Sequence, residues 1–110
     1  MNDQATPQVI DQDDRFAVIV DDTRAGYTIY VDHEAADGTV ERIFPHTTVQ
    51  EEYAGQGLAS VLVRGALEAT IAAGARIVPV CPYVKGWIEK HPDFASHVVA
   101  PTPTHLQLLR

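Results

Sequence analysis

The pattern of apolar and polar residues divides the chain into a strand-rich first half and a helical second half. Short runs rich in β-forming residues occupy 15–20, 27–32, 40–44 and 46–49, and Pro45 separates the last two runs. Turn-forming residues separate the runs, including an Asp37-Gly38 pair that is a strong hairpin signal. Consecutive strands without an intervening helix predict an antiparallel meander.

Residues 57–73 carry a helical period instead. Their apolar side chains form one wide face, whereas Ser60, Arg64 and Glu68 form a narrow polar stripe, and Gly74 supplies a C-terminal stop signal. A helix of this kind is predicted to pack on a sheet.

A fifth strand is predicted at residues 77–80, followed by a second helix over 82–91. Because a helix separates this strand from the fourth, the two strands are predicted to be parallel. We therefore expect one α/β (α+β) domain at 13–99, with a mixed, mainly antiparallel sheet and two principal helices. A flexible polar tail is expected at 1–12 and an irregular tail at 100–110.

Length and charge narrow the functional classes. The chain has 110 residues and a net charge of −7, which is concentrated in residues 1–52, where twelve acidic residues face three arginines. Such an acidic half argues against a nucleic-acid partner. The mildly basic second half could accommodate an anionic cofactor. The alternative is that these charges are solvated surface charges without a functional role. No apolar run reaches the roughly 18 residues of a membrane span, and no signal-peptide pattern begins the chain. With one cysteine, the cytoplasm is the expected compartment.

Two glycines stand where a strand is predicted to lead into the first helix. Gly55 and Gly57 flank Gln56, and glycine there allows positive φ and close approach of a phosphate to main-chain amides. A tight turn without a ligand is the alternative interpretation of this short pattern.

The surrounding residues carry a family resemblance. Val49-x4-Ala54-Gly-Gln-Gly57-Leu-Ala59 resembles the acetyl-CoA loop of the GNAT N-acetyltransferase superfamily, Arg/Gln-x-x-Gly-x-Gly/Ala, although Ala54 stands where Arg or Gln is preferred. His46-Thr47, Cys81-Pro-Tyr-Val84 and Lys90-His-Pro92 resemble motifs of a small subfamily of minimal acetyltransferase-like proteins. The resemblance covers roughly residues 14–99.

This resemblance implies a minimal GNAT fold and coenzyme A as cofactor. In such proteins the pantetheine arm lies along a fourth strand that splays from the fifth, and loop amides bind the pyrophosphate. The tryptophan of the second helix, Trp87, would be a cofactor wall or simply part of the core. The residues implied in cofactor binding are Thr47, Thr48, Val49, Gly55, Gln56, Gly57, Leu58, Ala59, Ser60 and Trp87.

Cys81 is the first candidate for chemistry. Pro82 favours the first helical position, which makes Cys81 a plausible N-cap, and the helix dipole favours a thiolate there. The thiol could accept the acetyl group from the thioester, and the resemblance also points to this cysteine. The alternative is a buried small hydrophobe.

His46 is the candidate general base, or else a histidine that holds its strand by a hydrogen bond. Larger GNAT enzymes protonate the leaving CoA thiolate with a tyrosine, and that position falls near Ile88, with Tyr83 one turn earlier. Glu51 and Glu52 are expected on the solvent-exposed surface.

The sequence thus predicts an acetyl-CoA-dependent N-acetyltransferase that acts on an amine, with or without a Cys81 thioester. The alternatives are a non-catalytic CoA-binding module and a thiol sensor. Only residues 21–26 separate the first two strands, too few for the helix pair that shapes the acceptor pocket in larger relatives. We expect an open acceptor side for a bulky protein acceptor, or a site that a partner completes.

Overall fold

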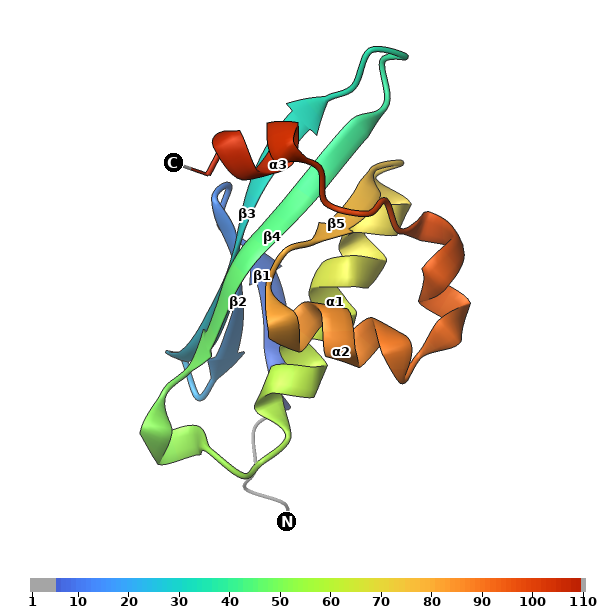
Figure 1. Ribbon diagram of the computed structural model, residues 1–110. Helices are drawn as coiled ribbons and strands as arrows, with labels where there is room; N and C mark the ends of the chain where they lie inside the picture. Colours follow the sequence, from blue (N-terminus) through green and yellow to red (C-terminus); the bar gives the residue numbers. More distant parts are fainter. Residues whose placement is uncertain (1–5, 110) are drawn as a thin grey trace.

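The computed structural model describes residues 6–109 and shows one mixed sheet with helices on both faces (Figure 1). The strands lie in the order of the sequence, antiparallel except for the parallel β4–β5 pair, as predicted. The strands are β1 (Gln8–Asp11), β2 (Arg15–Val20), β3 (Thr23–Glu34), β4 (Val40–Val49) and β5 (Arg76–Pro79). The helices are η1 (Glu51–Tyr53), α1 (Leu58–Ala72), α2 (Pro82–Glu89), η2 (Pro92–His97) and α3 (Pro103–Gln107).

Strands β2 and β3 form an antiparallel hairpin with a turn of only two residues. Asp21 and Asp22 adopt φ angles of 51° and 64°, the left-handed conformation that a primed hairpin turn requires. The chain therefore passes directly from β2 to β3, with no helix pair between them.

The polar N-terminal segment contains a strand that the sequence did not predict. Residues 8–11 form β1 and pair antiparallel with β2, whereas residues 1–5 lie outside the described residues. Tyr30 fixes this edge by donating its hydroxyl proton to Asp11 Oδ1 at 2.7 Å. Burial, followed by the hydrogen bond to Asp11, raises the pKa of Tyr30 to about 12. The apolar pair Val9-Ile10 was too short to give a strand signal on its own.

Strand β4 is continuous, so the predicted division at Pro45 is wrong. The β3–β4 register shifts between Ile29 and Val31, next to the point where Pro45 lies on β4. A bulge of this kind accommodates a residue that has no N–H to donate.

The C-terminal segment is also more ordered than expected, because it includes the short helix α3. Thr102 caps this helix together with His105, and His105 Nε2 lies 2.7 Å from Glu41 Oε1 on β4. Figure 1 shows α3 lying across β4. This tertiary contact joins residues 64 positions apart, so local sequence patterns could not reveal it.

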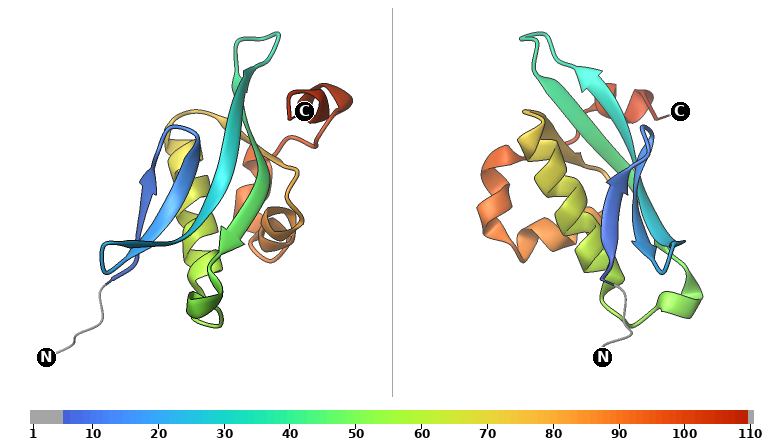
Figure 2. Two further views of the ribbon diagram at one scale, coloured as in Figure 1. Left: turned by 90° about the vertical axis from the view of Figure 1, so that its left-hand side faces the viewer. Right: turned by 180° about the vertical axis from the view of Figure 1, so that it is seen from behind.

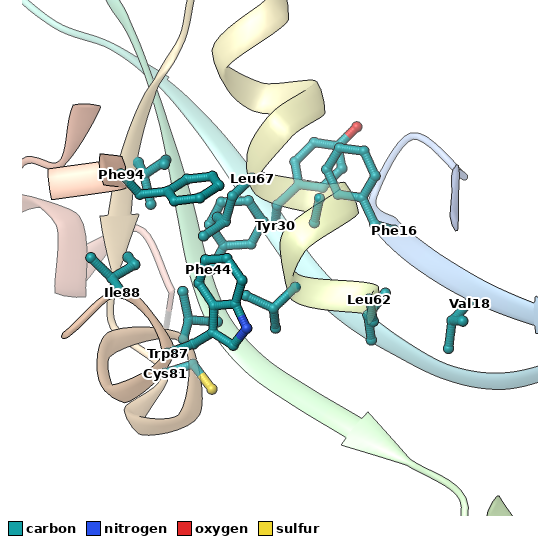
Figure 3. Close-up of a cluster of buried hydrophobic side chains, with 14 of the residues drawn as sticks. Phe16, Val18, Tyr30, Phe44, Leu62, Leu67, Cys81, Trp87, Ile88 and Phe94 are labelled. Atoms are coloured by element: carbon teal, nitrogen blue, oxygen red, sulfur yellow. The ribbon is translucent and has the colours of Figure 1, made fainter. Parts of the chain in front are cut away.

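The main core lies between the sheet and α1, with α2 on the same side (Figure 2). Phe16 and Phe44 from the sheet, Leu62 from α1 and Trp87 from α2 belong to one buried cluster (Figure 3). None of the described helices has the length and apolar character that a bilayer crossing requires.

Two helix-interior glycines allow a test of this packing. A Cβ on Gly65 of α1 would lie 2.8 Å from the Val9 side chain of β1, whereas a Cβ on Gly86 of α2 would meet nothing within 4 Å. We expect Gly65→Ala to cost about 1–3 kcal/mol through steric overlap. Gly86→Ala should instead add about 0.5–1 kcal/mol, because alanine favours a helix.

Thermal unfolding of the two variants checks this prediction, since helix propensity alone would raise both midpoints. A higher Tm for Gly65→Ala would contradict the close packing of β1 on α1.

Candidate functional site

The site is built around a wedge between β4 and β5. The two strands pair only from Glu41–Arg76 to Phe44–Pro79, and the Cys81 amide then donates to the Phe44 carbonyl at 2.7 Å. Beyond this bond β4 continues to Val49, whereas the segment that follows β5 turns away from β4 and enters α2. The main chain of β4 from Pro45 onward therefore has no β5 partner, which is the predicted splay.

The glycine turn lies where β4 leads through η1 into α1. Gly55 and Gly57 have φ angles of 81° and 75°, and a Cβ on either would meet no atom within 4 Å. Gly57 is the N-cap of α1 but offers no side-chain cap, so the first-turn amides of Leu58, Ala59 and Ser60 remain available.

This turn fits a phosphate by its main chain alone. Open space above the glycines allows an anion to approach, and the N-terminus of the 15-residue helix α1 supplies positive partial charge. Ala54 and Gln56 are exposed, whereas Leu58 is buried, so Leu58 can contribute only its amide.

Cys81 is the N-cap residue of α2, as predicted, although its side chain makes no capping bond. Its side chain is buried, and Sγ lies 3.5 Å from Thr47 Oγ1. Thr47 Oγ1 is 2.9 Å from Thr28 Oγ1, which in turn lies 3.3 Å from the His46 carbonyl. Because that carbonyl can only accept, Thr28 donates to it, Thr47 donates to Thr28, and the thiol donates to Thr47.

Thr28 was missed by sequence reasoning. It is fully buried in β3, and its only sequence signal is a hydroxyl among the apolar residues of the second predicted strand. It gives the Thr47 hydroxyl its orientation and so determines what the thiol of Cys81 faces.

His46 is not brought to Cys81. Successive residues of a strand alternate between faces, so His46 and Thr48 lie on the face opposite Thr47. The exposed His46 ring bonds Thr48 Oγ1 through Nε2 at 2.7 Å and lies 6.5 Å from the Tyr27 ring centroid. A proton acceptor on this face could serve only a group that approaches from the side away from α1.

Trp87 is 5 % exposed and belongs to the core, yet its indole also lines a surface pocket. Its N–H donates to Ser60 Oγ at 2.9 Å, which ties α2 to the first turn of α1. Ile88 is buried, whereas Tyr83 is 43 % exposed and desolvation raises the pKa of its phenol.

Comparison with known proteins places these features in one class. The model of the GCN5-related N-acetyl-transferase family matches residues 15–98. The chain therefore belongs to the GCN5-related N-acetyl-transferase family, whose members generally use acetyl-CoA as cosubstrate.

Solved structures share the fold. A GCN5-like protein from Staphylococcus aureus, solved by NMR, is 19% identical with a TM-score of 0.61, and the match covers 89% of this chain and 93% of that one. A ribosomal-protein-alanine N-acetyltransferase from Brucella melitensis biovar Abortus 2308 is 18% identical with a TM-score of 0.56, covering 80% of this chain and 63% of that one. No curated protein matches the sequence. The narrower resemblance to the minimal subfamily stays a prediction.

The hydroxyl chain behind Cys81 leads to a prediction on thiol reactivity. When the thiol loses its proton, the Thr47 hydroxyl can turn its proton from Thr28 Oγ1 to the sulfur, which lies 3.5 Å from Thr47 Oγ1. Thr47→Val should slow alkylation of Cys81 by iodoacetamide about tenfold, because hydrogen bonds to charged groups contribute about 1.5–3 kcal/mol.

Thr48→Val is the matched control, since Thr48 lies on the other face and bonds His46. Equal alkylation rates for wild type and Thr47→Val would show that Thr47 does not act on the thiolate.

Proposed function

We propose that this protein transfers an acetyl group from acetyl-CoA to an amine acceptor. The observation that carries the proposal is the wedge between β4 and β5, which opens beside the glycine turn at the start of α1. One extended ligand with a pyrophosphate at one end and a thioester at the other fits both features. The unpaired edge of β4 at Thr47–Val49 suits the amide groups of a pantetheine arm.

Cys81 lies at the narrow end of this wedge and is the proposed acetyl carrier. Its sulfur attacks the thioester carbonyl, the carbon–sulfur bond to CoA breaks, and CoA leaves as a thiolate that takes up the proton. The amine then attacks the acetyl-cysteine and a carbon–nitrogen bond forms. The Cys81 sulfur leaves as a thiolate and the nitrogen gives up one proton to a base. Return of a proton to the sulfur then restores the Cys81 thiol.

His46 is the proposed base for that proton. It faces the side of the sheet that α1 and α2 do not cover, where α3 lies across β4 (Figure 1). The two-residue β2–β3 turn leaves no helix pair there, so a large acceptor such as a protein amine would have room.

The cofactor assignment is tested at Gly57 with a matched control. Gly57 and Gly38 both have positive φ and open space at Cβ, so alanine should strain the main chain equally at each. Only Gly57→Ala would place a methyl group over the phosphate turn. We expect about a tenfold loss of CoA affinity in Gly57→Ala and none in Gly38→Ala.

The measurement is the rise in Tm at increasing CoA concentration, which reports binding to the folded state. Absence of any CoA-dependent rise in the wild type would refute the cofactor assignment.

The covalent route is tested by intact-mass spectrometry after incubation with acetyl-CoA. We expect the wild type to gain the mass of one acetyl group and Cys81→Ala to gain none. Transfer to an amine by Cys81→Ala at the wild-type rate would instead establish direct transfer. Tight CoA binding without adduct or turnover would establish a non-catalytic binding module.

A further inference from the structure

Tyr27 lies beside His46, on the face of the sheet opposite α1 and α2 (Figure 2). Two arginines surround its ring. The guanidinium carbons of Arg15 and Arg24 lie 4.9 Å and 5.3 Å from the Tyr27 ring centroid, within the range of a cation–π contact. These contacts place both arginines on the face that carries His46, the proposed base. We call these four residues the arginine patch.

The acidic first half of the chain contains only three arginines, and two of them belong to this patch. Arg15 is neutralised by Asp14, since its Nε and Nη2 donate to the two carboxylate oxygens at 3.0 Å and 3.1 Å. The third arginine, Arg42, donates in the same way to Asp32 at 2.7 Å and 3.0 Å. Of the three, only Arg24 has no ion pair with a residue that the structure describes.

The Arg24 guanidinium is positioned by neutral partners. Besides the ring of Tyr27, it contacts Gln12, whose Oε1 accepts from Nη1 at 3.3 Å. The Gln50 side chain donates to the Arg24 carbonyl at 2.9 Å, which fixes the main chain at the start of β3. The two exposed aspartates of the preceding turn form no ion pair with it. Most of its five N–H donors therefore remain free to bind a carboxylate.

Arg24 and His46 lie on opposite sides of Tyr27 along β3. Arg24 comes before Tyr27 in the strand, whereas His46 pairs with Ile29, which comes after it. The two distances to the Tyr27 ring place the Arg24 guanidinium carbon at most about 12 Å from the His46 ring centroid, which is the length of about three extended residues. A group at His46 and a carboxylate at Arg24 can therefore belong to one short segment of chain.

We propose that the arginine patch selects an acidic peptide segment as the acetyl acceptor, an inference that rests on the proposed function. The amine of the peptide lies at His46, and a carboxylate side chain within about three residues of that amine pairs with Arg24. The two-residue β2–β3 turn leaves this face of the sheet open to an extended segment. Arg24 is thus a specificity-determining residue, which favours an acidic acceptor and repels a basic one.

The first test measures binding without acetyl-CoA. Three peptide amides with a free N-terminal amine serve as probes: Ala-Val-Glu-Leu, Ala-Val-Gln-Leu and Ala-Val-Lys-Leu. Each is titrated while the main-chain NMR resonances of Tyr27 and Thr48 are followed. We expect the glutamate peptide to shift both resonances and to bind about fivefold more tightly than the glutamine peptide, as for one exposed charge-assisted contact. The lysine peptide should bind more weakly than either.

Substitutions at Arg24 assign the preference. Arg24→Gln should make the affinities for the glutamate and glutamine peptides equal by weakening only the first. Arg24→Lys should retain part of the difference, because an ammonium group keeps the charge but lacks the planar fork. Arg76→Gln is the matched control, since it removes the same charge from β5, where Arg76 pairs with Glu41. It should preserve the fivefold difference.

The patch assignment is wrong if the wild type binds none of the peptides, binds the glutamate and glutamine peptides equally, or binds the lysine peptide most tightly. It is also wrong if Arg76→Gln acts like Arg24→Gln. The mass of each peptide after incubation with acetyl-CoA then reports acetyl transfer. Transfer to all three peptides at equal kcat/KM would overturn the patch assignment and leave the proposed function standing. Selective binding of the glutamate peptide without transfer to it would overturn the proposed function and leave Arg24 as the determinant of a peptide-binding face.

Discussion

The hydrogen bond from the Cys81 amide to the Phe44 carbonyl is the constraint on which the site depends. It is the last main-chain link between β4 and the segment that follows β5. On one side of it the strands share a parallel ladder, and on the other they diverge. It therefore fixes Cys81 at the apex of the wedge, starts α2 at Pro82 and leaves the β4 edge free. A parallel pair can diverge in this way because its connection, α1, is packed on the sheet and holds both strands independently of their ladder.

Much of this arrangement was predictable because it depends on residues that are close together in the sequence. The Asp37-Gly38 pair, the two glycines before α1 and Pro82 at the start of α2 are short-range signals, and the structure contains the β3–β4 turn and the two helices they predict. The parallel β4–β5 pair followed from topology, since a helix separates the strands. The family, too, was recognisable from the spacing of its motifs.

The features that escaped prediction depend on contacts distant in sequence. Strand β1 is defined by its pairing with β2 and by the bond from Tyr30 to Asp11, not by its own composition. Helix α3 is held in place by the hydrogen bond between its buried His105 and Glu41 of β4. In the site, Thr28 could be recognised only after the structure placed it behind Thr47. The separation of His46 from Cys81 likewise follows from strand alternation around a bulge whose position the sequence does not mark.

That alternation has a consequence for how such a protein can change over time. Thr47 belongs to the face that meets Cys81, while its neighbours His46 and Thr48 belong to the other. Under the proposed function, substitutions on the uncovered face would alter which acceptor docks without touching the groups proposed to hold the cofactor. One strand would then be under two evolutionary pressures, with one face constrained by the cosubstrate and the other free to diversify. A lineage built on this scaffold could acquire new acceptors one residue at a time while its acetyl donor stayed the same.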